Sequence, residues 1–118
     1  MPTATPPRRL GSPEDVDFEL VQDVIPVEAR PSIVSYMERA SVLLAGGGYW
    51  IDPFTGSDLP YAEMTDGTYI WSAPWAFLVG RYGVRLPADF LAHMQALEFE
   101  PPEISDEELD RIGDAEGL

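Results

Sequence analysis

Residues 65–71 read Thr-Asp-Gly-Thr-Tyr-Ile-Trp (TDGTYIW), and this stretch decides which fold the chain can adopt. Asp66 and Gly67 separate two β-prone runs. An Asp-Gly pair in this position predicts a hairpin with a type I′ turn, whose two central residues both need positive φ. Side chains alternate along a strand, so Tyr69 and Trp71 share one face of the second strand. We therefore expect helices to cover one face of a small sheet.

Helical patterns lie on both sides of this hairpin. Apolar residues recur at helical spacing in three segments, near 32–45, 73–82 and 87–97. The glycines at 46–48 predict the end of the first helix by C-capping. After them, the aromatic and β-branched run 49–51 predicts a short strand.

Capping residues indicate where these helices begin and end. Pro31 and Pro74 suit first helical turns, and Ser72 is the expected N-cap of the helix at 73–82. Gly83 is expected to end that helix. Ser105 begins a capping box that predicts a short acidic helix near the C-terminus.

These elements predict a single α+β domain, with a small, mostly antiparallel sheet packed against three or four short helices. We expect the sheet within residues 49–71. The domain limits are an N-terminal arm at 1–28, mobile or partly ordered and outside the core, an α+β core at 29–100 and an acidic C-terminal segment at 101–118. Whether residues 12–25 form a helix or a strand stays open, because their apolar spacing fits both periods.

The composition limits the setting of the protein. With 118 residues and 45% hydrophobic composition, the chain suits one small domain. It contains no cysteine, so its stability depends on packing, and a reducing compartment is the expected one. The first residues do not resemble a secretory signal, and no apolar run approaches the roughly 20 residues that cross a bilayer. We expect a soluble, cytoplasmic protein.

The charge restricts the partners. The chain has 21 acidic residues against seven basic ones, a formal net charge of −14. Such a charge makes nucleic acid and anionic membranes poor direct partners and favours a basic protein. The competing interpretation is that the acidity only maintains solubility.

Aromatic residues concentrate around the predicted hairpin. Trp50, Trp71 and Trp75 lie where the sheet would meet a helix, and core packing is their expected role. An exposed aromatic platform for a ligand or partner is the alternative. Phe54 and Tyr61, in and beside a turn-rich stretch, are better placed than the helical aromatics to reach a binding surface.

No motif identifies a reaction. His93 is the single histidine, and Asp89 lies four residues earlier on the same predicted helix face, but no nucleophile accompanies them. The glycines at 46–48 lack the Lys-Ser/Thr of a phosphate loop. Nearby carboxylates do not have calcium-loop spacing. We therefore expect no catalytic residue, no metal site and no cofactor.

Five stretches carry a resemblance: SIVSYMERASVLLAG, IDPFTGSDL, TDGTYIW, FLVGRYGVRLPADFLAHM and PPEISDEELDRI. Over residues 31–112 the chain resembles a group of small, acidic, uncharacterised actinobacterial proteins. Small acidic proteins of this kind are similar to the immunity proteins of bacterial toxin systems, which bind and block a cognate toxin. The resemblance implies a shared fold and transfers no functional residue.

Two functions follow as hypotheses. The first is a non-enzymatic acidic protein-binding domain, an immunity-type inhibitor that occludes a basic toxin or another basic partner. The second is a structural or regulatory accessory protein that acts through an aromatic surface or as a homodimer. The first predicts contacts from carboxylates on loops and in the acidic segment, together with two aromatic residues: Asp58, Glu63, Glu98, Glu100, Glu103, Asp106, Glu107, Glu108, Phe54 and Tyr61.

Overall fold

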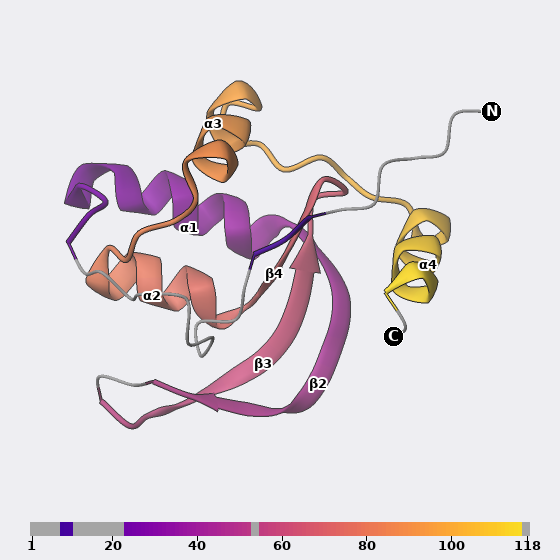
Figure 1. Cartoon of the computed structure of the whole chain (residues 1–118), viewed down its shortest axis with the longest axis horizontal. Helices are drawn as coiled ribbons and strands as arrows, with labels where there is room; N and C mark the ends of the chain where they lie inside the picture. The colour runs from indigo at the N-terminus through magenta and orange to yellow at the C-terminus, as the bar shows by residue number, and fades with distance from the viewer. Residues whose placement is uncertain (1–7, 11–22, 53–54, 117–118) are drawn as a thin grey trace.

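The structure, a computed structural model, describes residues 8–10, 23–52 and 55–116. Helices α1, α2 and α3 gather on one side of a four-stranded sheet, whereas α4 lies apart from them beside β2 (Figure 1). In chain order the elements are β1 (Arg8–Arg9), the 3-10 helix η1 (Val27–Ala29), α1 (Arg30–Arg39), β2 (Ser41–Ile51), β3 (Asp58–Thr65), β4 (Tyr69–Ser72), α2 (Pro74–Tyr82), α3 (Ala88–Ala96) and α4 (Asp106–Ala115). The predicted single α+β domain is confirmed.

The sheet is mostly antiparallel, as expected, and its strands are ordered β1-β4-β3-β2. β3 pairs antiparallel with both β2 and β4, whereas β1 pairs parallel with β4. The N-terminal arm therefore contributes to the fold at residues 8–10, where the Leu10 amide also donates to the Ile70 carbonyl oxygen at 2.9 Å. Leu10 is partly buried and packs against the core cluster without belonging to it. The open choice between helix and strand falls mostly on residues outside the described ranges.

The β3–β4 hairpin is present, but its turn is not the predicted type I′. Three residues, 66–68, connect the strands, and only Gly67 among them has positive φ, at 88°. The Asp66 carboxylate accepts hydrogen bonds from the Thr68 and Tyr69 amides at 2.9 and 2.7 Å. The Thr65 hydroxyl accepts one from the Gly67 amide at 3.0 Å. These side chains satisfy the amides of the turn, so a second left-handed residue is not needed.

The first helix ends earlier than predicted, at Arg39 rather than near residue 45. Ala40 is extended, and β2 begins at Ser41, which pairs with Thr65. Residues 46–48 accordingly lie inside β2, at a register irregularity, and do not cap a helix. Pairing with β3 outweighs the helical spacing of the local sequence, and the sheet spans more than the predicted 49–71.

The other helices follow the sequence pattern closely. α2 and α3 fall within the predicted 73–82 and 87–97, and Gly83 ends α2 in a left-handed conformation. Ser105 caps α4 by accepting a hydrogen bond from the Glu108 amide at 3.2 Å. Ser72 is not the N-cap of α2, because it is the last residue of β4 and Ala73 occupies the cap. Within the described ranges, no helix combines the length and apolarity needed to cross a membrane.

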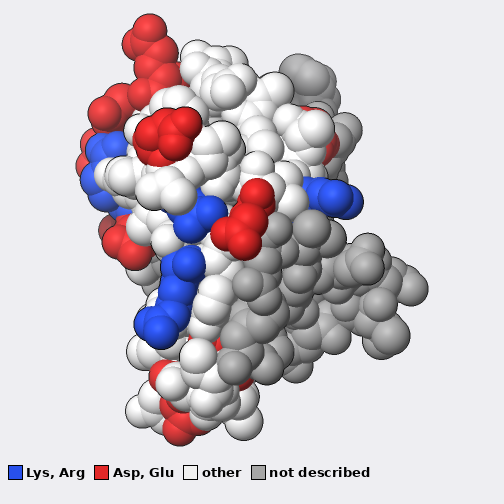
Figure 2. All heavy atoms as spheres, turned by 90° about the vertical axis from the view of Figure 1, so that its left-hand side faces the viewer, with Lys and Arg blue, Asp and Glu red and all other residues white. Residues whose placement is uncertain are grey.

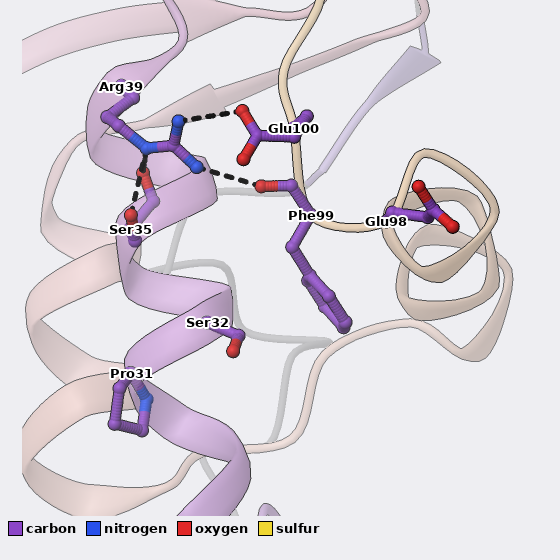
Figure 3. Close-up of a pocket in the computed structure, with 7 residues that line it drawn as sticks. All are labelled: Pro31, Ser32, Ser35, Arg39, Glu98, Phe99 and Glu100. Atoms are coloured by element: carbon purple, nitrogen blue, oxygen red, sulfur yellow. Dashed lines mark hydrogen bonds and ion pairs between the residues drawn. The ribbon is translucent and has the colours of Figure 1, made fainter.

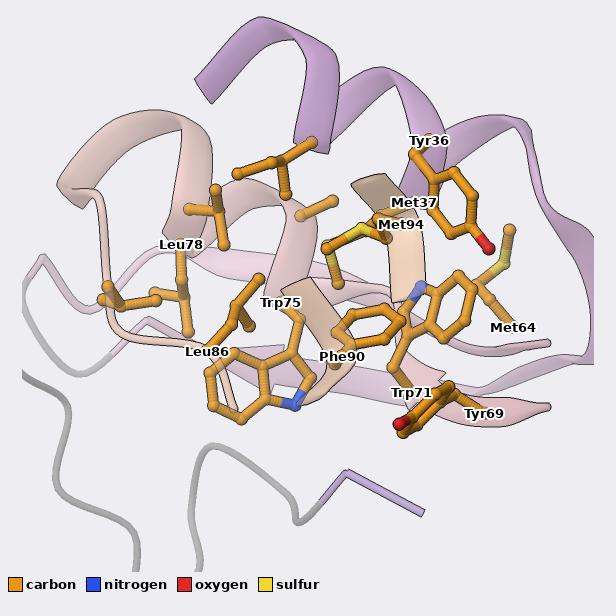
Figure 4. Packing of buried hydrophobic residues seen from close by; sticks show 14 of the residues in the cluster. Tyr36, Met37, Met64, Tyr69, Trp71, Trp75, Leu78, Leu86, Phe90 and Met94 are labelled. Atoms are coloured by element: carbon orange, nitrogen blue, oxygen red, sulfur yellow. The ribbon is translucent and has the colours of Figure 1, made fainter. Parts of the chain in front are cut away.

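The aromatic residues mainly form the core, as expected. Trp71, Trp75 and Phe90 are almost fully buried between the sheet and the helices (Figure 4). The ring of Phe90 packs against Trp71 with centroids 5.3 Å apart, and against Tyr69 at 4.9 Å. Among the aromatic residues that the structure describes, Tyr49 is the exception, with 73% of its surface exposed on β2.

Replacement of Gly67 by valine should destabilise the fold by about 1–3 kcal/mol, because a β-branched residue is strained at positive φ. The new Cβ would also lie 3.1 Å from Ile104 Cδ1. Urea unfolding measures the effect. Gly113→Val is the matched control, because a Cβ at Gly113 meets no atom within 4 Å and its φ is ordinary for a helix. Equal stability of the two variants would contradict the turn geometry.

Replacement of Trp75 by alanine should lower the free energy of unfolding by about 3–5 kcal/mol, since the residue is completely buried. Tyr49→Ala removes another large aromatic group from an exposed position and should change stability by less than about 0.5 kcal/mol. Chemical denaturation of both variants provides the comparison. A Trp75→Ala loss as small as that of Tyr49→Ala would show that Trp75 is not a core residue.

Candidate functional site

The strongest candidate surface is the acidic segment that follows α3. Residues 98–116 hold nine carboxylates and one arginine, so they carry eight of the 14 excess negative charges. Glu98 and Phe99 adopt left-handed conformations, with φ of 54° and 58°. These two residues turn the chain away from α3 and toward α4. The segment therefore forms a distinct acidic side of the molecule.

Arg39 ties the beginning of this segment to α1 (Figure 3). Its Nη1 donates to Glu100 Oε2 at 3.0 Å, its Nη2 to the Phe99 carbonyl oxygen at 2.9 Å, and its Nε to Ser35 Oγ at 2.9 Å. A guanidinium group suits this task because its donors lie in one plane and point in several directions. A shallow pocket of about 340 Å³ lies here, lined by Pro31, Ser32, Ser35, Arg39, Glu98, Phe99 and Glu100.

The second half of the segment is organised by α4. Asp106 and Glu107 are exposed in the first turn of this helix, where negative side chains interact favourably with the helix dipole. Glu108 is half-buried and forms an ion pair with Arg111. A second shallow pocket, of about 440 Å³, is lined by Glu103, Ile104, Ser105 and Asp106. Two of the predicted contact residues, Glu103 and Asp106, thus lie around one depression.

The opposite end of the molecule has a different charge pattern. Arg30 lies at the start of α1, Arg81 in the last turn of α2, and Arg85 in the connection to α3. This end, on the left of Figure 1, faces the viewer in Figure 2, where basic and acidic side chains are interspersed. α4 lies at the opposite end, on the right of Figure 1. The net negative charge is therefore concentrated at one end of the protein.

The remaining predicted contact residues differ from one another in solvent exposure, and the two carboxylates among them lie in a strand and not in a loop. Asp58 is exposed, but it is the first residue of β3 and not part of a loop. Glu63 also lies within β3, where it is buried and accepts a hydrogen bond from the Tyr61 hydroxyl at 3.1 Å. The predicted loop position of Glu63 is wrong, and Tyr61 is half-buried beside it. Phe54 lies outside the described residues.

His93 has a carboxylate partner, but a different one from the residue predicted. Asp89 accepts a hydrogen bond from the Tyr69 hydroxyl at 3.2 Å. His93 Nε2 instead lies 3.1 Å from Oδ2 of Asp66, in the β3–β4 turn. The same oxygen accepts a hydrogen bond from the Tyr36 hydroxyl at 2.5 Å. Sequence spacing favoured the partner on the same helix, whereas the fold supplies one from a distant turn.

This Tyr36–Asp66–His93 network fits a structural role. The Asp66 side chain has no solvent exposure and that of His93 is 24% exposed. A carboxylate-bound imidazole is one part of many nucleophilic catalytic sites. Here no hydroxyl or amine nucleophile hydrogen-bonds His93 within the described ranges, where Asp66 is its one polar partner. The network joins α1, the β3–β4 turn and α3.

Within the part of the chain that the structure describes, no group of three or more His, Cys, Asp or Glu residues is arranged to hold a metal ion.

Two contacts of the structure could not be predicted from the sequence. The contact of Arg39 with Phe99 and Glu100 joins residues about 60 positions apart. Local sequence contains no signal for this contact or for the Tyr36 hydrogen bond.

Comparison of the chain with models of protein families, with curated proteins and with solved structures finds no match.

The Tyr36–Asp66 contact should make stability fall at alkaline pH. Burial, followed by the hydrogen bond to Asp66, raises the pKa of Tyr36 above its usual value of 10.0. The unfolded chain then loses this proton at about pH 10 while the folded protein keeps it, so unfolding becomes easier as pH rises further. One retained proton corresponds to a slope of about 1.4 kcal/mol per pH unit.

Urea unfolding between pH 8 and 11 measures this slope. Tyr36→Phe should be less stable at pH 7, by about 1.5–3 kcal/mol for a lost hydrogen bond to a charged group. It should also show a shallower decline above pH 10. Tyr49→Phe, on a tyrosine exposed to solvent, serves as the control and should keep the wild-type slope. Identical slopes for all three proteins would contradict the assignment.

Proposed function

We propose that this chain is a non-enzymatic protein-binding domain whose acidic segment docks on a basic partner. The observation that carries the proposal is the concentration of eight excess negative charges in residues 98–116, at one end of the molecule. A general requirement for solubility would be met by charges spread over the whole surface. Concentrated charge of one sign instead steers and orients an oppositely charged protein.

The solvent exposure and the ion pairing of these carboxylates also support the proposal. Glu98, Glu103, Asp106 and Glu107 are all exposed, and none of them forms an ion pair with another described residue. In contrast, Glu100 and Glu108 are paired with Arg39 and Arg111. Within the described ranges these four carboxylates have no internal counterion, so they are available to basic side chains of a partner. Asp110 and Asp114 on α4 are exposed in the same way.

The finer proposal is that the domain is an immunity-type inhibitor acting in the cytoplasm. Inhibition would require only that the docked domain covers the active surface of a basic toxin. This mechanism needs no catalytic group, cofactor or metal ion from the chain. The absence of cysteine is compatible with a reducing compartment.

One observation favours a second role, as a structural or regulatory accessory protein. Tyr49 and Ile51 on β2 are 73% and 62% exposed, and exposed apolar side chains on an outer strand are suited to protein contacts. A homodimer would cover them. Analytical ultracentrifugation at micromolar concentration tests this role, which predicts a dimer without any partner.

The binding proposal predicts an association rate that depends on salt and on specific carboxylates. The partner is obtained by affinity capture from cells that naturally make the chain, and association is followed by stopped-flow fluorescence. Raising salt from about 0.05 to 0.5 M shortens the Debye length from roughly 14 to 4 Å. This change should lower the association rate more than it raises the dissociation rate.

A double variant, Glu103→Gln with Glu107→Gln, should reproduce part of the loss at low salt, roughly 2- to 5-fold in association rate. Glu28→Gln with Glu38→Gln is the matched control, because these exposed residues lie on η1 and α1 and the charge change is identical. An association rate insensitive to salt, or lowered equally by both double variants, would count against docking through the acidic segment.

A further inference from the structure

β2 is the outer strand of the sheet. It is last in the order β1-β4-β3-β2 and, among the described residues, it pairs with β3 alone. An outer strand presents a row of backbone donors and acceptors that another strand can use. The C-terminal end of this outer strand consists of Tyr49, Trp50 and Ile51.

The backbone of this end is oriented for such pairing. The Asp52 amide donates to the Ser57 carbonyl oxygen at 2.8 Å, so Asp52 points its backbone groups toward β3. Successive residues of an antiparallel strand direct their backbone amide and carbonyl groups to opposite edges of the strand. The backbone groups of Trp50 therefore also point toward β3, whereas those of Tyr49 and Ile51 point away from it. Tyr49 is opposite Pro60, which has no amide proton and therefore suits a position where the paired residues form no hydrogen bond with each other. The amide and carbonyl groups of Tyr49 and Ile51 therefore point to the open edge.

The side chains leave this edge unprotected. Of the six large hydrophobic residues with exposed side chains in the described ranges, four lie on β2: Val42, Leu44, Tyr49 and Ile51. β2 contains no charged residue and no proline among its 11 positions. Outer strands are usually protected by lysine, proline or a bulge at the exposed position. The 49–51 end has none of these features.

The charges beside this edge select a basic occupant. β2 and β3 together contain two carboxylates, Asp58 and Glu63, and no basic residue. Asp58 is opposite Ile51 in the ladder, so the two side chains share a face, and Asp58 is exposed. α4 contacts β2 as well, but beside the end of the strand that follows α1 and away from residues 49–51 (Figure 1). A second copy of the chain would bring the same carboxylates to the edge and would be repelled by them.

We propose that residues 49–51 accept an extended segment of the basic partner as an additional strand. Its backbone would bond to the outward amide and carbonyl groups of Tyr49 and Ile51. Its apolar side chains would cover Tyr49 and Ile51 on one face of the sheet. The alternate lysine or arginine side chains would lie on the opposite face, where the net negative charge of the protein attracts them. Strand addition of this kind obtains affinity from main-chain hydrogen bonds and specificity from alternate side chains. The inference rests on the proposed function, because the occupant belongs to the same basic partner.

A defined peptide tests the proposal on the full chain. The probe is a fluorescent, end-capped octapeptide of alternating lysine and valine, and its isomer with four lysines followed by four valines controls for composition. Binding is measured by anisotropy, and hydrogen exchange of the protein amides is followed by NMR. The alternating peptide should bind more tightly than its isomer. It should also slow exchange of the Tyr49 and Ile51 amides on the order of tenfold, as expected for newly formed strand bonds.

Two charge-matched variants localise the contact. Ile51→Lys should weaken binding of the alternating peptide on the order of tenfold, because it places a charge in the apolar contact. Val27→Lys changes the net charge equally at another exposed apolar residue, on η1 and 69% exposed, and should have less than about a twofold effect. Circular dichroism confirms that both variants fold.

The outcomes separate this inference from the function on which it rests. Salt-sensitive binding of both peptides, with unchanged exchange at residues 49–51 and equal effects of the two variants, would overturn strand addition and leave the acidic partner surface in place. An octapeptide of alternating glutamate and valine that binds equally well would overturn the basic partner itself. A dimer that Ile51→Lys converts to a monomer would show that the edge receives a second copy, which also overturns the proposal.

Discussion

The buried carboxylate of Asp66 is the constraint on which the rest of the structure depends. A carboxylate removed from water is costly unless hydrogen bonds replace its solvation. In this chain the donors are the amides of Thr68 and Tyr69, the Tyr36 hydroxyl and the His93 ring. The two amides come from its own turn. The other two come from α1 and α3, so satisfying one side chain fixes the positions of two helices against the hairpin.

The aromatic core is arranged around this point. Tyr36 packs on Trp71 and on Phe90, with ring centroids 6.2 and 6.5 Å apart, while its hydroxyl reaches Asp66. The Tyr69 ring contacts both Phe90 and His93. One polar contact and several ring contacts therefore select the same arrangement of helices and sheet. Agreement between polar and apolar contacts of this kind favours a single packed structure over alternatives.

Local sequence predicted the elements whose limits are set by local chemistry. The hairpin position, α2 and α3 agree with the predictions, since proline, glycine and apolar spacing act over a few residues. The end of α1 was missed because Leu44 continues the helical spacing of Ile33 and Met37, and the competing strand β3 is distant in sequence. The acidic segment was visible in composition. The burial of Glu63 and the choice of Asp66 by His93 depend on tertiary contacts that no local pattern contains.

The contrast between Asp66 and the carboxylates of residues 98–116 also bears on function. Asp66 is completely satisfied inside the protein, whereas Glu103, Asp106 and Glu107 remain exposed, near one another in sequence and without a described counterion. Like charges held together in this way repel, and that repulsion destabilises the folded state by a small amount. A basic partner, as proposed above, would remove this repulsion and add attraction at the same residues, so the arrangement would favour the complex over the free domain. Because Arg39 and Arg111 are already engaged by Glu100 and Glu108, the internal arginines of this region do not compete with the partner for these carboxylates.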